Sequence, residues 1–151
     1  MRLSDYMRDS LIFLDLDAEE KTTAITKTVD LMKDTKAITD PEKFLNSVLE
    51  RERLGSTAIG KGVALPHART PHINQITIAI SRLKNGIDFG AEDDEPVKLI
   101  FLLGTPLKSV SEYLNVLARL SRVIKDDKFR KKLLKAGTAV QVRSLFEEIE
   151  Q

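Results

Sequence analysis

The sequence predicts an α/β domain in which a mixed central sheet lies between helices. Short apolar runs alternate along the chain with longer segments whose apolar residues recur at helical spacing, a pattern typical of a sheet covered by helices on both faces. Residues 99–103 are wholly apolar, as in a strand that is buried on both faces. Asn85-Gly86 is a turn signal that implies one hairpin, so we expect antiparallel as well as parallel pairing.

The composition is that of one ordinary globular domain. The chain has 151 residues, of which 42% are hydrophobic and 31% are charged. Lys and Arg number 24 against 23 Asp and Glu, a balance that argues against nucleic acid or an anionic membrane as the main partner. The absence of cysteine excludes disulfides and thiolate chemistry. The chain lacks the apolar run of a signal peptide and any apolar stretch near the ~20 residues of a membrane span, so we expect a cytoplasmic protein.

One strand and two helices are expected in the first third of the chain. Leu11–Leu14 is a short β-type run. Asp17 with Glu20 forms a capping-box pattern for a helix that extends to about residue 34. A second helix begins at Asp40-Pro41, with a cap followed by a proline at its first position. The core-facing residues at helical spacing are Ile25, Val29 and Met32 in the first helix and Phe44, Leu45, Val48 and Leu49 in the second.

Three strands and three helices are expected in the rest of the chain. The strands cover residues 63–65, 75–82 and 97–103, with a brief edge segment at 87–89 and an acidic loop at 91–95. The helices cover about 109–125 and 127–136, and a last helix begins at Thr138. Ser109 and Glu112 form a second capping box. The predicted apolar stripes are Val110, Tyr113, Leu114, Leu117, Leu120 and Ile124 in the first of these helices and Val142, Leu145, Phe146 and Ile149 in the last.

The segment 55–69 holds the strongest candidate for chemistry. Glycines at positions 55, 60 and 62 permit positive φ and close backbone approach, so we expect a tight, shaped loop. Pro66 fixes its own φ and mounts His67 at a rigid corner just past a short buried strand. Imidazole is nucleophilic and near half-neutral at physiological pH, so this mounting suggests a functional histidine. A lone loop histidine is also often a surface or structural residue, and the residues alone leave both interpretations open.

The same region resembles a known active-site signature. Arg51-Glu52-Arg53-Leu54-Gly55-Ser56-Thr57, followed by Ile59-Gly60-Lys61-Gly62-Val63-Ala64-Leu65-Pro66-His67, is similar to the signature of the fructose/mannitol-type enzyme IIA domain of the phosphoenolpyruvate:sugar phosphotransferase system, a family with a nitrogen-regulatory branch. The likeness in element order extends over roughly residues 3 to 148. It implies a single enzyme IIA domain over residues 1–151, with a mixed sheet of about five strands and no cofactor.

The resemblance implies that His67 accepts a phosphoryl group from an HPr-like phosphohistidine carrier protein. The family is phosphorylated on Nε2, which would leave Nδ1 to a backbone carbonyl or a carboxylate. The family also has an active-site arginine at the position of Arg51, and a guanidinium matches phosphate and keeps its charge at working pH. Alternatively, Arg51 is a solvated helix-end residue paired with Glu50 or Glu52. Arg53, which also precedes the loop, competes with Arg51 for the phosphate-stabilising role.

Three further residues are candidates for contact with phosphate. Ser56 and Thr57 lie in the glycine-rich bend, where hydroxyls and N–H groups either reach phosphate or stabilise the turn. Many family members have a second active-site histidine where the resemblance places Tyr113, which donates a hydrogen bond but does not protonate near neutral pH. Tyr113 also fits the core stripe of its helix. His67 and His72 without Cys or well-placed carboxylates are too weak a pattern for a metal, so we predict no metal site.

Two functions fit these residues. The chain passes the phosphoryl group to an enzyme IIB domain in sugar transport, or its phosphorylation state acts as a regulatory signal to a protein partner. A regulatory binding module that transfers nothing is an alternative, and a histidine-dependent hydrolase is disfavoured because no nucleophile or carboxylate pair has a convincing spacing. We expect contact with a membrane only indirectly, through a permease. A shallow apolar surface around His67 is predicted to contain Ala58, Ile59, Leu65 and Ala68.

Overall fold

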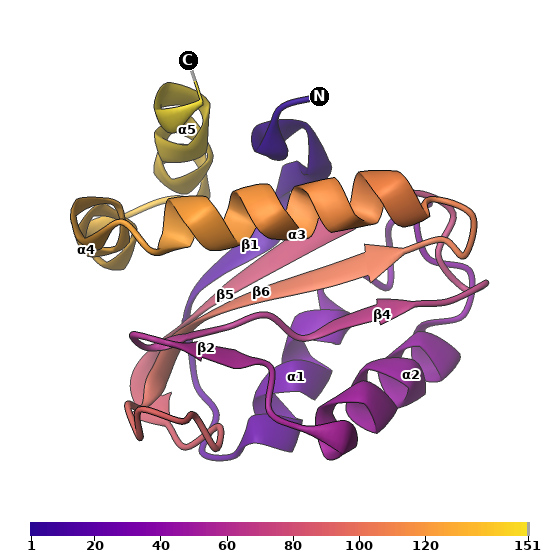
Figure 1. Cartoon of the computed structure of the whole chain (residues 1–151), viewed down its shortest axis with the longest axis horizontal. Coiled ribbons are helices and arrows are strands. Elements are labelled where there is room, and N and C mark those ends of the chain that lie inside the picture. The colour runs from indigo at the N-terminus through magenta and orange to yellow at the C-terminus, as the bar shows by residue number, and fades with distance from the viewer. Residues whose placement is uncertain (151) are drawn as a thin grey trace.

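The chain folds around a six-stranded mixed sheet (Figure 1). The computed structural model describes residues 1–150, and its strands are β1 (Met7–Leu16), β2 (Ala58–Gly60), β3 (Val63–Ala64), β4 (His67–Arg69), β5 (Thr77–Ile87) and β6 (Val97–Thr105). The order across the sheet is β1-β5-β6-β3-β2, and β4 also pairs with β6. β5 pairs antiparallel with β6 and β2 with β3, while the other pairs are parallel. The α/β class and the mixed sheet are confirmed, with six strands in place of about five.

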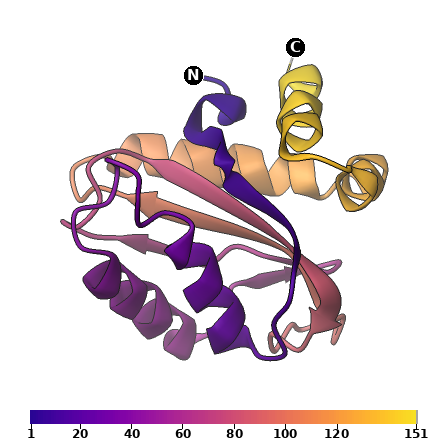
Figure 2. The ribbon, with the colours of Figure 1, turned by 180° about the vertical axis from the view of Figure 1, so that it is seen from behind.

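Helices cover both faces of this sheet (Figures 1 and 2). They are the 3-10 helix η1 (Leu3–Tyr6) and the α-helices α1 (Lys21–Asp30), α2 (Pro41–Leu54), α3 (Val110–Ile124), α4 (Asp127–Lys135) and α5 (Ala139–Ile149). α1 and α2 pack on one face, and η1 packs with α3, α4 and α5 on the other. Across residues 1–150, every helix falls short of the length and apolar character that a membrane crossing requires.

Strand β6 contributes to the cores on both faces of the sheet. Leu99, Phe101 and Leu103 point into the core that α3, α4 and α5 cover. Ile100 and Leu102 point into the core beneath α1 and α2. All five side chains are at most 3% exposed. The apolar run therefore behaves as predicted, since successive residues of a strand face opposite sides and both sides are covered here.

The hairpin between β5 and β6 exists, but the predicted turn at Asn85-Gly86 is wrong. Both residues lie inside β5, and the connection runs through residues 88–96. A Cβ on Gly86 would lie 2.7 Å from the Cβ of Pro96, so the glycine serves close packing beside the next strand. The edge segment expected at 87–89 is only the end of β5, at Ile87.

Two predicted capping boxes do not form. Glu20 precedes α1 without a side-chain cap, and that helix ends at Asp30 rather than near residue 34. Ser109 makes no capping bond to α3, and the Glu112 carboxylate instead accepts the Tyr6 hydroxyl at 2.9 Å. Side-chain caps do form at the predicted starts of α2 and α5, at Asp40 and Thr138. A capping pattern in the sequence therefore competes with tertiary partners for the same side chains.

The apolar stripe predicted for α3 is only partly correct. Leu120 and Ile124 are buried, and Val116 joins them, whereas Val110 and Leu114 are 42% and 57% exposed. The periodicity of a wide stripe does not say which of its residues face the sheet. The other stripes are buried at Ile25, Val29, Met32, Phe44, Val48, Val142 and Phe146 and partly buried at Leu45, Leu49 and Leu145, while Ile149 is exposed. The start of α3 thus leaves apolar surface open.

Gly86→Ala is predicted to destabilise the fold. The added methyl would meet the Cβ of Pro96 at 2.7 Å, and forcing a methyl group into packed space typically costs about 1–3 kcal/mol. Gly55→Ala is the matched control, because a Cβ there meets nothing within 4 Å and the backbone is extended. Urea unfolding measures both variants, and equal midpoints for the two would contradict the packing role of Gly86.

Candidate active site

His67 is held directly on the central strand. β3 and β4 both run parallel to β6, and His67 lies opposite Leu103. Pro66 interrupts the pairing between the two short strands, and its carbonyl accepts the N–H of Leu103 at 2.9 Å. His67 therefore comes just after the short buried strand β3, as predicted, but it begins a second short strand and does not lie at a corner. Its backbone is fixed to a strand that is buried on both faces.

The main chain also fixes the tautomer of the His67 ring. Nδ1 lies 2.8 Å from the carbonyl oxygen of Leu65. A carbonyl oxygen only accepts hydrogen bonds, so Nδ1 carries the proton and Nε2 keeps its lone pair in the neutral ring. The Leu65 carbonyl is the partner that the sequence left open between a backbone group and a carboxylate.

The surroundings keep this ring neutral. Burial lowers the pKa of His67 below its ordinary value of 6.5. The hydrogen bond to Leu65 opposes that change because it stabilises the protonated ring. The Arg51 charge lowers the pKa further, and the Glu52 charge raises it. The net effect favours the neutral, nucleophilic imidazole near pH 7.

His67 lines an open surface depression of about 380 Å³. One wall comes from the end of α2 and the bend that follows it, with Arg51, Ser56 and Thr57. The opposite wall comes from α3, with Leu117, Ala118 and Ser121. The structure thus brings four of the predicted site residues, Arg51, Ser56, Thr57 and His67, to one depression.

The two candidate arginines have different surroundings. Arg51 lines the His67 depression, and its Nη1 donates to the carbonyl of Gly55 at 2.9 Å. Arg53 pairs with Glu50 at 2.9 Å and lines a separate pocket between α1 and α2. The guanidinium charge of Arg51 also lowers the pKa of His67. The geometry therefore favours Arg51 over Arg53 as the cation beside the histidine.

The Ser56 and Thr57 hydroxyls of the bend already donate hydrogen bonds to other groups of the protein. Ser56 Oγ donates to the carbonyl of Phe89 at 2.5 Å. Thr57 uses both its N–H and its hydroxyl on the Glu52 carboxylate, at 2.9 and 2.5 Å. The sequence suggests Glu52 only as a partner for Arg51, whereas in the structure its carboxylate accepts both hydrogen bonds from Thr57. An acidic residue five positions before a threonine carries no signal of such a contact in the sequence.

Tyr113 lies beside His67, where the resemblance implied a second histidine. The two ring centroids are 6.0 Å apart, and the ring planes are inclined at 47°. Burial raises the pKa of Tyr113, which the charges of Arg51 and Arg69 oppose, so the phenol is protonated near pH 7 and able to donate. Within residues 1–150 no group of three or more His, Asp or Glu side chains is arranged to hold a metal ion.

The apolar surface beside the site partly matches the prediction. Ala58, Ile59 and Leu65 line the His67 depression as expected, although Leu65 is only 4% exposed, whereas Ala68 is buried in the core and does not line it. Arg69, on β4, donates to the carbonyl of Leu107 at 2.9 Å, which ties the loop before α3 to the strand of His67. The large exposed apolar side chains of this region are Leu107, Val110 and Leu114. We call these three residues the α3 patch.

Fold and site together define a class of protein, an α/β domain that presents one neutral imidazole beside an arginine in an open surface depression. The family described as "Phosphoenolpyruvate-dependent sugar phosphotransferase system, EIIA 2" matches residues 5–149. The chain belongs to this family of enzyme IIA proteins, as its signature resemblance implied.

Similar proteins include a fructose-specific enzyme IIA component and a nitrogen regulatory protein. The "PTS system fructose-specific EIIA component" of Haloferax volcanii is 35% identical over 139 residues, which cover 92% of this chain and 90% of the relative. The crystal structure of nitrogen regulatory protein IIA-Ntr from Neisseria meningitidis has a TM-score of 0.90 at 30% identity and covers 95% of this chain and 98% of that one. A chain of the Escherichia coli complex of enzyme IIAMTL and phosphorylated enzyme IIBMTL shares the fold, with a TM-score of 0.79 at 21% identity over 94% and 99%.

We expect the His67 imidazole to titrate below pH 6.5, with Nδ1 protonated in the neutral form. As the pH falls below 6.5, the unfolded chain binds the proton first, so the folded state loses stability in that range. Arg51→Met should raise the pKa, because that guanidinium lowers it. Arg53→Met is the matched control and should leave it unchanged. Nitrogen-15 NMR titration measures the pKa of His67 and shows which ring nitrogen carries the proton in the neutral form. A wild-type pKa above 6.5 would contradict this account.

Proposed function

We propose that His67 is a phosphoryl acceptor that receives its group from an HPr-like phosphohistidine carrier protein. The Nε2 lone pair attacks phosphorus, the donor's nitrogen–phosphorus bond breaks, and the donor imidazole leaves with that electron pair. The Nδ1 proton stays on the ring, where the Leu65 carbonyl stabilises the positive charge that the ring gains. This hydrogen bond is the observation that carries the proposal, because it leaves the unprotonated Nε2 as the nucleophile.

In this proposal Arg51 stabilises the transferring group. Its guanidinium lines the depression and donates to the carbonyl of Gly55, which leaves further N–H donors for phosphate oxygens. Its charge also lowers the pKa of His67 and so keeps the ring unprotonated until the phosphoryl group arrives. Tyr113 supplies a phenolic donor beside the ring in place of a second imidazole. Ser56 and Thr57 act through the shape of the bend, since their hydroxyls already donate to protein acceptors.

The phosphoryl group then passes to an enzyme IIB domain or serves as a regulatory signal. Similarity to the fructose-specific protein and the fold shared with the IIA–IIB complex support transfer, and similarity to IIA-Ntr supports regulation. In both cases the chain is a covalent intermediate in a relay between proteins. Incubating the phosphorylated chain with a purified IIB domain separates the two functions. The labelled phosphoryl group moves to IIB if the chain is a transfer protein, and it stays on His67 if the chain is only a regulator.

The partner surface is proposed to be apolar and open. Ile59 and Leu117 line the depression that holds His67, and Leu114 of the α3 patch precedes Leu117 by about one turn of the same helix. A folded donor must bring its own histidine within bonding distance of Nε2. An open depression admits such a partner, whereas a closed cavity excludes it. Exposed apolar side chains grouped beside a reactive residue are typical of a protein-docking surface.

His67→Ala is predicted to abolish phosphorylation and to leave the fold intact. The ring is half-buried and its removal leaves no charge unpaired, so the free energy of unfolding should change by about 1 kcal/mol. Mass spectrometry after incubation with phosphoenolpyruvate, enzyme I and the carrier protein measures the label. His72→Ala, which changes the second histidine of the chain, should label normally. An acid-labile, alkali-stable phosphate on His67→Ala would refute the assignment.

Arg51→Lys should slow phosphoryl transfer about ten-fold or more, because a lysine lacks the planar fork that binds two phosphate oxygens at once. Its stability should change by about 0.5 kcal/mol or less, as is usual for a surface substitution. Arg53→Lys is the matched control, since Arg53 pairs with Glu50 outside the depression. Rapid-quench transfer rates decide the point: slow transfer in Arg53→Lys alone would move the phosphate contact to that residue.

Leu114→Ser should weaken docking of the carrier protein without changing the chemical step. We expect the donor concentration for half-maximal rate to rise about ten-fold, because loss of a large apolar contact at an interface costs about 1–2 kcal/mol. Val140→Ser, on α5 and equally exposed to solvent, is the control for a surface away from His67. A fall in the maximal rate with an unchanged half-maximal donor concentration would contradict a docking role for the α3 patch.

A further inference from the structure

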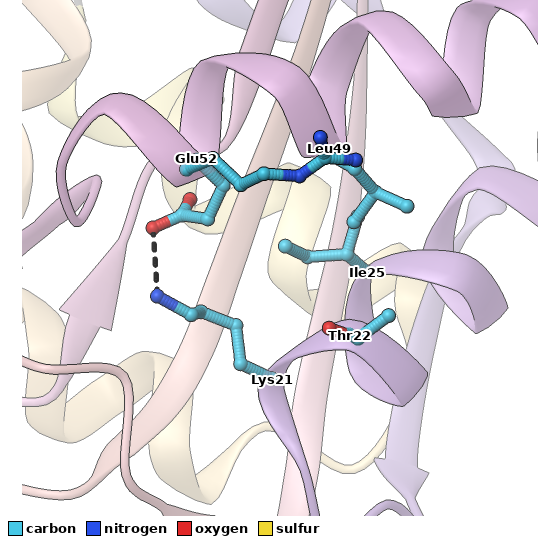
Figure 3. A pocket seen from close by; sticks show the side chains of 6 residues that line it. Lys21, Thr22, Ile25, Leu49 and Glu52 are labelled. Carbon is cyan, nitrogen blue, oxygen red and sulfur yellow. Dashed lines mark hydrogen bonds and ion pairs between the residues drawn. The ribbon is translucent and has the colours of Figure 1, made fainter.

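One ion pair lies behind the bend that faces His67. The Lys21 ammonium on α1 lies 3.2 Å from Oε2 of Glu52 on α2, as the dashed line in Figure 3 shows. The same ammonium donates to the Phe89 carbonyl at 3.4 Å and lies 5.4 Å from the centroid of the Phe89 ring. Lys21 therefore joins α1, α2 and the loop after β5 at a single point.

Both acceptors of Lys21 are also the acceptors of the bend. The Glu52 carboxylate receives the N–H and the hydroxyl of Thr57, and the Phe89 carbonyl receives the hydroxyl of Ser56. Ser56 in turn accepts the N–H of Ala58 through its hydroxyl oxygen, at 3.1 Å. The hydrogen bonds that the Ser56 and Thr57 hydroxyls donate thus both end on groups that Lys21 binds.

We propose that the Lys21–Glu52 ion pair positions the Ser56–Thr57 bend beside His67 for phosphoryl transfer, which makes Lys21 and Glu52 positioning residues. This proposal rests on the phosphoryl acceptance proposed above. Ser56 and Thr57 line the His67 depression on one side of the bend, and the ion pair holds them from the other. Neither Lys21 nor Glu52 lines that depression, so both act through the bend.

Because the Glu52 carboxylate is buried, it depends on its ion pair with Lys21. The Glu52 side chain is 5% exposed, and a buried carboxylate is stable only when its oxygens are paired. Lys21 supplies the compensating charge, is 31% exposed and lines a pocket of about 210 Å³ between α1 and α2 (Figure 3). Without the ammonium, the carboxylate would draw in water or turn outward, and the bend would lose its acceptors. Orientation errors of this kind slow a reaction without affecting the approach of a partner.

The test compares Glu52→Gln and Lys21→Met with the matched control Glu50→Gln, which changes an exposed carboxylate on the same helix. Two quantities are measured in the full chain: single-turnover transfer from the phosphorylated carrier protein and hydrogen exchange of the Thr57 amide. We expect a maximal transfer rate about ten-fold or more lower in both variants, with a half-maximal donor concentration within about two-fold of wild type. Thr57 exchange should be about ten-fold faster, while Glu50→Gln matches wild type in both measurements.

Thr57→Val keeps the test decisive if the charge variants fold poorly. It removes one hydroxyl and leaves the ion pair in place, and it should reproduce the fall in maximal rate. Faster Thr57 exchange with an unchanged transfer rate would overturn the proposal, and so would slow transfer with unchanged exchange. A wild-type chain that accepts no phosphoryl group would instead refute the proposed function, while the exchange measurement would still report whether the ion pair holds the bend.

Discussion

Strand β6 constrains the whole domain because neither of its faces can be exposed to water. Leu99, Phe101 and Leu103 need one helical layer, and Ile100 and Leu102 need another, so helices must pack on both sides of the sheet. Both edges of β6 also pair with neighbouring strands. β5 pairs along one edge, and β3 and β4 share the other, which ties the backbone of His67 directly to the central strand.

The sequence predicted features that depend on local periodicity and missed those that depend on distant partners. The buried strand, the α2 cap and the stripe of α1 all follow from spacing that survives in the fold. Asn85-Gly86 looked like a turn because only the folded chain shows Pro96 against Gly86. The capping box at Ser109 failed because the Glu112 carboxylate accepts a hydrogen bond from Tyr6, more than a hundred positions away.

In the site, too, the sequence predicted what depends on neighbouring residues and missed what depends on the folded path of the chain. A glycine-rich segment ending in Pro66 and His67 could be recognised from the sequence, and its resemblance to a family signature pointed to Arg51. The choice between Arg51 and Arg53 needed the direction of each side chain on α2, two positions that differ by over half a turn. The contact of Thr57 with Glu52 needed the path of the bend, which glycines make hard to foresee.

The hydrogen bond from Nδ1 of His67 to the Leu65 carbonyl has a consequence for protein engineering. Because a main-chain oxygen fixes the tautomer, replacing the Leu65 side chain leaves the reactive nitrogen unchanged. The chemistry is encoded in the path of three residues held against a buried strand. A design that copies this backbone path onto another parallel strand pair would therefore keep the same ring nitrogen free.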